Sequence, residues 1–277
     1  MYRMNLDEYE SAVAAACLNP TLPYPANHFA FRHVLKDLPD PTSTSVVEIG
    51  VGMGGAIPLF AGTGFSFAGF DRDGACVESS RRALSEAGQD PSRIITADLE
   101  DPESYAALPG AGSFDALIAM GVLPQVTSVR QAILNAVSLV RPGGHVFFEF
   151  RNALFSLVTF NRYTREFICD QLLGDASSEV REAVDAELAK RLNLTIPAGE
   201  IHPESFHVPF DIIAIARELG LEEPRIIPFH FHAGMPAIEG DVAQSYRLDS
   251  VSMEDDASGW KGLFLASAFL LRAQRAE

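Results

Sequence analysis

The chain has 277 residues, of which 47% are hydrophobic and 21% charged, and its formal net charge is -16. This length and composition indicate a globular protein with a full hydrophobic core and exclude a largely disordered chain. An excess of negative charge repels phosphate backbones and anionic lipid, so nucleic acid and membrane surfaces are disfavoured as partners.

Two further absences in the sequence narrow the class of protein. The first twenty residues lack the apolar segment of a secretory signal, and no apolar run reaches the ~20 residues needed to cross a bilayer. We therefore expect a cytoplasmic protein. Cys17, Cys76 and Cys169 form no CxxC pair, so neither a disulfide framework nor a cysteine metal site is predicted.

The first 150 residues divide into a helical segment and a repeating pattern. Residues 1–44 predict one or two helices, broken by prolines near residues 20–25. From 45 to 150, short apolar runs alternate with amphipathic stretches, which is typical of βα units that build a parallel sheet. The expected strands are 45–50, 65–70, 93–97, 114–120 and 145–150. The expected helices are 55–62, 73–87, 104–108 and 128–140, the last stopped by a Pro-Gly-Gly turn.

After residue 150 the pattern changes. Two helical stretches, about 153–173 and 178–194, predict a helical lid inserted into the sheet domain. A helix at 210–220 and strands at 224–234 and 263–271 complete the sheet. The acidic segment 235–261 predicts an irregular loop or a second flap. The expected organisation is an N-terminal helical segment (1–44), a cofactor-binding Rossmann-like half (45–150), a lid (151–209) and the completion of the sheet (210–277).

The first predicted strand runs into a glycine-rich loop and then a helix. Such a loop lets a ligand approach the backbone closely, and helix N–H groups point toward it. A small-molecule site is therefore expected at this strand end. Gly50, Gly52 and Gly55 fit the GxGxxG pattern of dinucleotide sites, while Glu48, Gly50, Gly52 and Gly54 fit an ExGxGxG pattern. The loop alone fits both patterns, so it does not identify the ligand.

Acidic residues at strand ends favour the second pattern, which resembles motif I of class I S-adenosylmethionine-dependent methyltransferases. Dinucleotide folds usually have an apolar residue at the position of Glu48, where a buried carboxylate costs desolvation. Asp71 ends the second strand, where both classes place an acid against ribose hydroxyls. Asp98 ends the third strand, and in these methyltransferases a carboxylate at that position usually accepts a hydrogen bond from the adenine amino group. The segments FDALIAMGVLPQV (114–126) and LVRPGGHVFFEF (139–150) follow in the order of that family.

This resemblance covers residues 45–150 and implies a fold and a cofactor. The implied fold is α/β, a Rossmann-like seven-stranded sheet of order 3-2-1-4-5-7-6 with the inserted helical lid. The implied cofactor is S-adenosylmethionine, and the residues expected to bind it are Glu48, Gly50, Gly52, Gly54, Asp71, Arg72, Asp98, Leu99 and Met120.

The implied function is methyl transfer to a small polar metabolite, such as a sugar or a natural-product intermediate, with O-methylation preferred over N- or C-methylation. An NAD(P)-dependent oxidoreductase using GxGxxG and a noncatalytic nucleotide-binding protein are the alternatives. The sequence indicates no oligomeric state. Specificity resides in lids and late loops rather than in the fold, so the acceptor is not identified.

The substrate is expected above the carboxyl ends of the fourth and fifth strands, beneath the lid. Substrate candidates are Arg151, Asn152, Tyr163 and His207. A hydroxyl acceptor needs a base, and His207 is preferred to His202 as the catalytic candidate because it lies nearer the sheet.

Other histidines receive no catalytic assignment from the sequence. His230 and His232 share one strand face without a nearby carboxylate, on a strand expected to lie far from the cofactor, so no metal site is predicted.

The N-terminal helix carries Phe29, Arg32 and His33. These three side chains are expected either to close over the pocket or simply to pack against the core.

Overall fold

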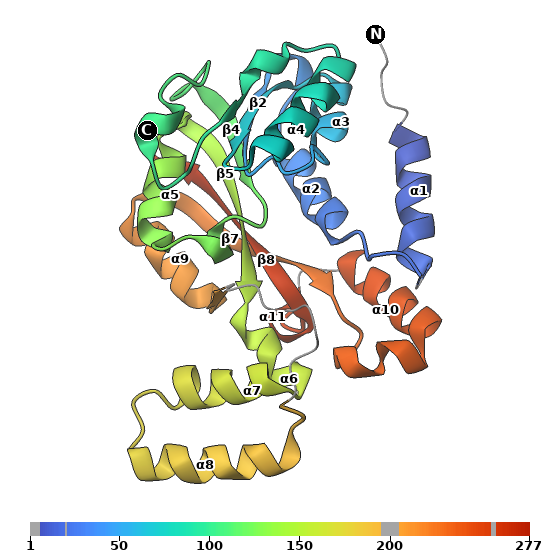
Figure 1. Cartoon of the computed structure of the whole chain (residues 1–277), viewed down its shortest axis with the longest axis vertical. Coiled ribbons are helices and arrows are strands. Elements are labelled where there is room, and N and C mark those ends of the chain that lie inside the picture. The colour runs from blue at the N-terminus through green and yellow to red at the C-terminus, as the bar shows by residue number, and fades with distance from the viewer. Residues whose placement is uncertain (1–5, 20, 195–204, 256–258) are drawn as a thin grey trace.

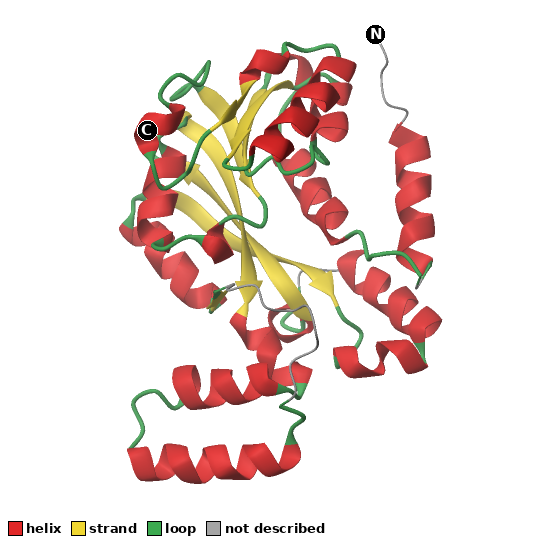
Figure 2. Cartoon of the chain, viewed as in Figure 1, coloured by secondary structure: helices red, strands yellow, loops and turns green. Residues whose placement is uncertain are grey.

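A single mixed β-sheet forms the centre of the computed structural model, which describes residues 6–19, 21–194, 205–255 and 259–277 (Figure 1; Figure 2). Its order is β3-β2-β1-β4-β5-β8-β7, and a short strand, β6, pairs with β5. The strands are β1 Ser45–Ile49, β2 Ser66–Asp71, β3 Ile94–Thr96, β4 Phe114–Ala119, β5 Val140–Asn152, β6 Phe206–His207, β7 Leu221–Phe231 and β8 Ala266–Arg275.

The sheet confirms the predicted fold class. Apart from the added strand β6, the strands follow one another in the predicted spatial order. Strands β3, β2, β1, β4 and β5 pair in parallel, while β8 is antiparallel to both β5 and β7. The carboxyl ends of the parallel strands therefore meet at one edge, where open α/β sheets bind ligands.

Helices cover both faces of the sheet (Figure 1). Strands β1 and β4 are almost wholly buried, as expected for central strands with helices on either side. The apolar side chains of α5 and α9 belong to one core, and those of α2, α3 and α4 to the core on the other face. These helices are α2 Ala26–Asp37, α3 Ile57–Phe60, α4 Gly74–Glu86, α5 Val129–Val137 and α9 Pro209–Glu218.

Capping residues explain where two of the predicted helices begin. Asp73 accepts a hydrogen bond from the backbone N–H of Ala75 at the start of α4 (2.7 Å), and Ser128 accepts one from Gln131 at the start of α5 (3.4 Å). The helices predicted at 55–62 and 104–108 are shorter than expected. The first becomes α3 and a 3-10 turn, and the second a single 3-10 turn, Pro102–Tyr105.

The Pro-Gly-Gly segment lies inside β5 rather than at the end of a long helix. Helix α5 ends at Val137 and β5 begins at Val140. The register between β4 and β5 shifts between Phe114 and Ala116. Near this bulge a Cβ on Gly144 would lie 2.3 Å from Val140 Cγ1. The prediction of a helix as far as residue 140 is wrong, because Val140 already pairs with Phe114 of β4, and the glycines then permit the bulge between the two strands.

The segment predicted as an irregular loop at 235–261 contains a helix, which corrects that prediction. Helix α10 spans Ala243–Asp255 and packs beside α1, Leu6–Leu18 (Figure 1). Its buried side chains are largely polar, among them Arg247 and Glu254. The Arg247 guanidinium donates to the backbone oxygens of Ala16 (3.3 Å) and Asn19 (2.7 Å). Polar groups therefore make the contacts, so the apolar periodicity that indicates a helix is missing.

The last predicted strand also differs. Residues Gly262–Leu265 form a short helix, α11, and β8 begins only at Ala266.

The insertion after β5 is helical, but the first of its two predicted helices, 153–173, is divided into shorter segments. It contains α6 Ser156–Thr159, α7 Arg162–Glu166, a π-helix Phe167–Leu172 and α8 Ser178–Arg191. Phe160, between α6 and α7, adopts a left-handed conformation with φ 53°, which interrupts the first helix. The insertion extends beyond the lower end of the sheet in Figure 1. In the part of the chain that the structure describes, no helix is long and apolar enough to span a bilayer.

Candidate functional site

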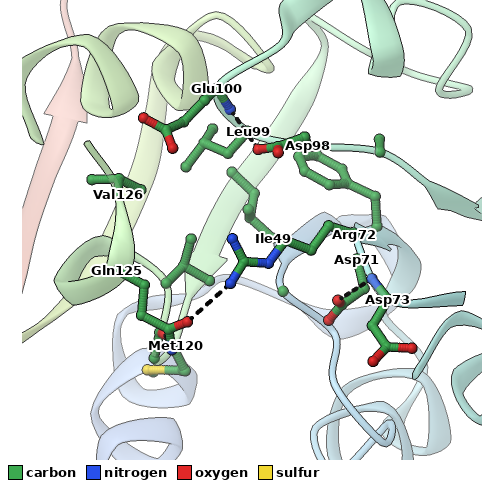
Figure 3. A pocket seen from close by; sticks show the side chains of 15 residues that line it. Ile49, Asp71, Arg72, Asp73, Asp98, Leu99, Glu100, Met120, Gln125 and Val126 are labelled. Carbon is green, nitrogen blue, oxygen red and sulfur yellow. Dashed lines mark hydrogen bonds between the residues drawn. The ribbon is translucent and has the colours of Figure 1, made fainter. Parts of the chain in front are cut away.

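Two adjoining cavities lie at the carboxyl edge of the sheet. The smaller, about 330 Å³, lies beside the ends of β1, β2 and β4 (Figure 3). The larger, about 620 Å³, lies between the glycine loop and the start of α2. Gly50 and Met120 line both cavities. Pockets of a few hundred cubic ångströms are typical of small-molecule sites, so an elongated ligand can occupy both.

The cofactor residues predicted from the sequence divide between the two cavities. In addition to the two shared residues, Asp71, Arg72, Asp98 and Leu99 line the smaller cavity. Glu48 and Gly52 line the larger one.

Gly54, which is also predicted to bind the cofactor, lies where the glycine loop meets α4. It does not belong to the described lining of either cavity. A Cβ on Gly54 would lie 3.2 Å from Ser80 Cα and 3.3 Å from Ala83 Cβ, so Gly54 allows α4 to pack closely against the loop.

Gly52 leaves open space at the loop. Its φ is +50°, and a Cβ there would meet no atom within 4 Å. Its N–H donates to Asp71 Oδ2 (2.9 Å), and its carbonyl oxygen accepts from Ser80 Oγ (2.9 Å). The loop is therefore held on both sides while its exposed side faces the larger cavity.

Asp71 organises the edge of the smaller cavity. Its Oδ2 accepts from Gly52, and its Oδ1 accepts from the backbone N–H of Asp73 (2.9 Å). Each carboxylate oxygen can accept more than one hydrogen bond, so capacity is left for the hydroxyls of a vicinal diol. The cap of α4 is supplied by Asp73 itself, which leaves Asp71 for the loop and the cavity.

The opposite end of the smaller cavity is formed around Asp98. Its Oδ1 accepts from the backbone N–H of Glu100 (2.9 Å). Arg72 reaches from the end of β2 toward Gln125, and its Nη2 donates to Gln125 Oε1 (3.3 Å; Figure 3). Gln125 Nε2 in turn donates to the carbonyl oxygen of Gly121 (2.9 Å). Gln125 is a lining residue that the sequence analysis missed, since only its segment was identified.

Glu48 lies in the larger cavity with an unsatisfied oxygen. The residue is 3% exposed, and its Oε2 has no hydrogen-bond partner among the described residues. Burial, and secondly the negative charge of Asp71, raises the pKa of Glu48 well above its ordinary value. A buried polar atom without a partner is costly unless something else satisfies it, so Glu48 indicates a polar ligand here.

The opposite wall of the larger cavity comes from the N-terminal segment. Tyr24, Asn27, His28 and Phe31 line it. Asn27, His28 and Phe31 are spaced so that they lie on one side of α2, and Tyr24 lies two residues before that helix begins. The residues predicted from the sequence on this helix, Phe29, Arg32 and His33, are not in this lining. The spacing of polar and aromatic residues from 24 to 31 was a usable signal.

The three residues that the sequence analysis chose on this helix make other contacts. The ring of Phe29 stacks on that of Tyr24 with centroids 5.7 Å apart. Arg32 Nη1 lies 3.6 Å from Asp255 Oδ1. His33 is half-buried and lines neither cavity, as far as the described residues define them.

Among the substrate candidates on β5, Asn152 has a structural role. It is 1% exposed, and its Nδ2 donates to the carbonyl oxygens of Leu263 and Ala266, both at 2.8 Å. Its Oδ1 accepts from the backbone N–H of Leu154 (3.1 Å). Both amide hydrogens are therefore used in contacts that join the end of β5 to the start of β8.

Arg151, on the same strand, belongs to a polar link at the carboxyl edge. Its Nη1 lies 3.5 Å from Glu149 Oε1. Glu149 Oε2 accepts from the backbone N–H of Gly121 (2.7 Å). The link therefore fastens the loop after β4, which carries Met120 and Gly121, to β5.

The remaining predicted substrate residues lie toward the insertion. The ring centroid of Tyr163 is 5.2 Å from that of Phe206, and the His207 ring is 5.1 Å from Phe150. Burial lowers the pKa of His207. As far as the described residues define the two cavities, no residue of 151–209 lines either, so the structure does not place the insertion over them as a lid. His202 lies outside the described residues.

His230 and His232 lie nearer the site than expected. Strand β7 runs in the same direction as β5, so its end reaches the carboxyl edge. The His230 ring stacks on Tyr24 with centroids 5.5 Å apart. Burial lowers the pKa of His230 to about 3 and that of His232 to about 4. Across the described residues, no group of three or more His, Cys, Asp or Glu side chains is arranged to hold a metal ion.

The arrangement fits S-adenosylmethionine. Asp71 offers carboxylate oxygens for ribose hydroxyls, and Asp98 and Leu99 lie in the same cavity. Glu48 offers an unsatisfied buried carboxyl beside the open face of Gly52 in the adjoining cavity. A ligand with adenosine at one end and a cationic amino acid at the other matches this donor set.

Comparison with known proteins agrees with the site. Residues 26–222, well over half of the chain, match the family described as a methyltransferase domain. The ubiquinone biosynthesis O-methyltransferase of Thiobacillus denitrificans is 29% identical over 177 residues, which is 64% of this chain and 64% of that protein. The protein of the same name from Vibrio parahaemolyticus is 24% identical over 206 residues, 74% of this chain and 75% of that protein. The chain thus spans just under two thirds of the Thiobacillus relative.

Solved structures show the same fold at low identity. An S-adenosylmethionine-dependent methyltransferase from Mesorhizobium loti superposes with a TM-score of 0.53 at 16% identity, covering 89% of this chain and 98% of that one. A Thermotoga maritima methyltransferase described as a possible histamine N-methyltransferase gives 0.50 at 16% identity, covering 99% and 97%. The fold is thus that of solved S-adenosylmethionine-dependent methyltransferases, and the chain belongs to the methyltransferase-domain family.

Proposed function

We propose that this protein transfers a methyl group from S-adenosylmethionine to an oxygen of a small polar metabolite bound in the larger cavity. The observation that carries this proposal is that Gly50 and Met120 line both cavities. A cofactor that fills the smaller cavity and passes these two residues presents its far end to the larger one. The acceptor therefore approaches from the side of α2.

The chain's own residues would hold the cofactor and position the acceptor. Asp71 and Asp98 would bind the adenosine, while Glu48 and the backbone at Gly52 would bind the amino acid end. When bound, the cofactor supplies a sulfonium-activated methyl group that an oxygen lone pair can displace. Most of the expected rate enhancement comes from holding the two reactants in line and excluding water.

Two observations support oxygen as the acceptor atom. The relatives in Thiobacillus and Vibrio are named O-methyltransferases. The larger cavity carries hydrogen-bonding side chains, Asn27 and His28, among apolar ones such as Val13 and Phe31. Such a lining suits a hydroxylated metabolite with an apolar body, of the kind found among sugar derivatives and natural-product intermediates. A cytoplasmic location stays a prediction.

The test is a turnover assay with a panel of hydroxylated small molecules and matched amines. The expected result is S-adenosylhomocysteine release together with an acceptor that has gained one methyl group, strongest with hydroxyl acceptors. Methylation of amines alone would contradict the choice of oxygen. Cofactor binding without turnover on any acceptor would favour the noncatalytic alternative, and tight NADH binding without S-adenosylhomocysteine binding would favour the oxidoreductase.

A further inference from the structure

The larger cavity is lined by a histidine that contacts a carboxylate from another helix. His28, on α2, is 5% exposed, and its Nε2 lies 3.3 Å from Oε2 of Glu10 on α1. Glu10 is about half exposed, with 53% of its side chain accessible, so the carboxylate keeps its contact with solvent. The pair therefore connects the wall of the cavity to the surface.

We propose that His28 is the general base that accepts the proton of the acceptor hydroxyl, and that Glu10 is its positioning residue. This inference rests on the proposed function, since it requires a hydroxyl acceptor in the larger cavity. It replaces His207, which lines neither cavity in the described structure. A carboxylate at Nε2 favours the tautomer with its proton there, and such pairs of histidine and carboxylate orient catalytic imidazoles.

The proposed step balances without any further reactant. The acceptor oxygen forms a bond to the methyl carbon as the bond from carbon to sulfur breaks, and that electron pair returns to sulfur. The hydroxyl proton passes to His28, which becomes an imidazolium. The proton then leaves to solvent, and Glu10 stabilises the transient positive charge.

The charged groups around His28 favour a neutral ring before the reaction. Burial lowers the pKa of His28, and Arg32 on the same helix acts in the same direction, while Glu10 raises it. The net shift is downward, so the imidazole is uncharged and able to accept a proton at neutral pH. Glu48 of β1, across from α2, is the one carboxyl in the described lining of this cavity, since Glu10 contacts His28 from outside that lining.

Other ionisable groups in the cavity are poorer candidates for the base. The Tyr24 hydroxyl donates to Glu254 Oε1 (3.4 Å), and burial raises the pKa of Tyr24, so it stays a neutral phenol. Glu48 lies beside the glycine loop and Asp71, where the cofactor is expected to bind. It is therefore assigned to the cofactor rather than to the acceptor hydroxyl. His28 is the cavity group whose ordinary titration range suits proton transfer near neutral pH.

The first test compares His28→Gln with His33→Gln. His33 lies on the same helix, is half-buried and lines neither cavity in the described structure. For His28→Gln we expect a loss in kcat of about 100-fold or more, typical of a missing general base. S-adenosylhomocysteine affinity should stay within about twofold, a free energy change below 0.5 kcal/mol. His33→Gln should retain both kcat and affinity.

The pH profile separates a base from a merely structural residue. The wild-type kcat/KM should fall as pH drops through the pKa of His28, because an imidazolium cannot accept a proton. In His28→Gln this acidic limb should be replaced by activity that rises with pH as the acceptor hydroxyl ionises. In Glu10→Gln the acidic limb should move to lower pH, because a group that raises the pKa of His28 is lost.

A second measurement needs neither turnover nor a variant. Nitrogen NMR of the histidine side chains in the full wild-type chain should show His28 neutral at pH 7, with its proton on Nε2. A neutral ring with the proton on Nδ1, or a protonated ring, would overturn the proposal, as would a His28→Gln variant with wild-type kcat and pH profile. Absence of wild-type turnover on every hydroxyl acceptor would instead contradict the proposed function.

Discussion

The half of the chain proposed to bind the cofactor, residues 45–150, and the helical insertion, residues 153–192, are organised in opposite ways. In the first, β1 and β4 are almost wholly buried, and polar side chains such as Asp71 turn inward to hold a loop over a cavity. In the second, α8 buries no side chain, and its charges pair with one another at the surface. The two regions should therefore respond very differently to substitution.

The largest expected effect is at the glycine loop. Gly52→Leu places a side chain in the open space of the larger cavity, so we expect S-adenosylhomocysteine affinity to fall by about 100-fold or more, which is roughly 3 kcal/mol. Gly88→Leu is the matched control, because Gly88 also has a positive φ (+81°) and open space around it but lies away from both cavities. Calorimetry on both folded variants measures the difference. Equal affinities would contradict the placement of the cofactor.

A smaller loss is expected from Asp71→Ala. The change removes the acceptor of two backbone N–H bonds and the proposed ribose contact. Hydrogen bonds to charged groups each contribute about 1.5 to 3 kcal/mol, so affinity should fall by at least about tenfold. Asp90→Ala removes a similar carboxylate turn at a surface position and should leave affinity unchanged. A similar affinity in Asp71→Ala and the wild type would show that the loop needs no such acceptor.

Helix α10, which lies outside both regions, carries a buried carboxylate. It therefore tests whether burying a charged group makes stability depend on pH. Glu254 is 5% exposed, and burial raises its pKa to about 7. Its folded pKa lies above its unfolded value, so the folded state holds the extra proton and its stability falls as pH rises from about 4.5 through 7. A shift of this size corresponds to about 3 kcal/mol at full ionisation.

Urea unfolding at pH 5 and pH 8 measures this effect. Glu254→Gln should lose much of the wild-type dependence on pH over this range, whereas the exposed Glu86→Gln should keep it. An unchanged pH dependence in Glu254→Gln would mean that Glu254 is ionised without cost in the folded protein.

The smallest effect is expected in the insertion. Asp185→Asn disrupts the ion pair that joins Arg165 of α7 to Asp185 of α8. Both side chains are substantially exposed, so solvent already screens the pair, and the midpoint of thermal unfolding should barely change. Cofactor affinity should be identical to that of the wild type. A clear loss of affinity would mean that the insertion does reach the site.

Local patterns were sufficient to predict the strands of residues 45–150 and the edge at which they end. The apolar run before Gly50 marks a buried strand, and the acids at 71 and 98 follow strands whose ends share one edge. The buried strands and the acids that follow them are set by residues close together in the sequence, so a sequence pattern can predict them. Gly54 shows the limit of the motif, because only the structure reveals how closely it packs against α4.

The acceptor side depends on contacts between distant segments. Asn152 is satisfied by carbonyl groups more than a hundred residues away, and Glu10 meets His28 through the packing of two helices. Helix α10 uses buried polar groups, which the apolar periodicity does not reveal. Such features follow from tertiary packing, so the pairing of Glu10 with His28 and the helical course of α10 were not predictable from periodicity or motif.

The most direct test of the central claim is a crystal structure with S-adenosylhomocysteine bound. The adenosine should lie beside Asp71 and Asp98, and the sulfur should lie at Gly50 and Met120, open toward the cavity lined by His28. A sulfur atom that faces the helical insertion, with protein filling the space toward α2, would contradict it.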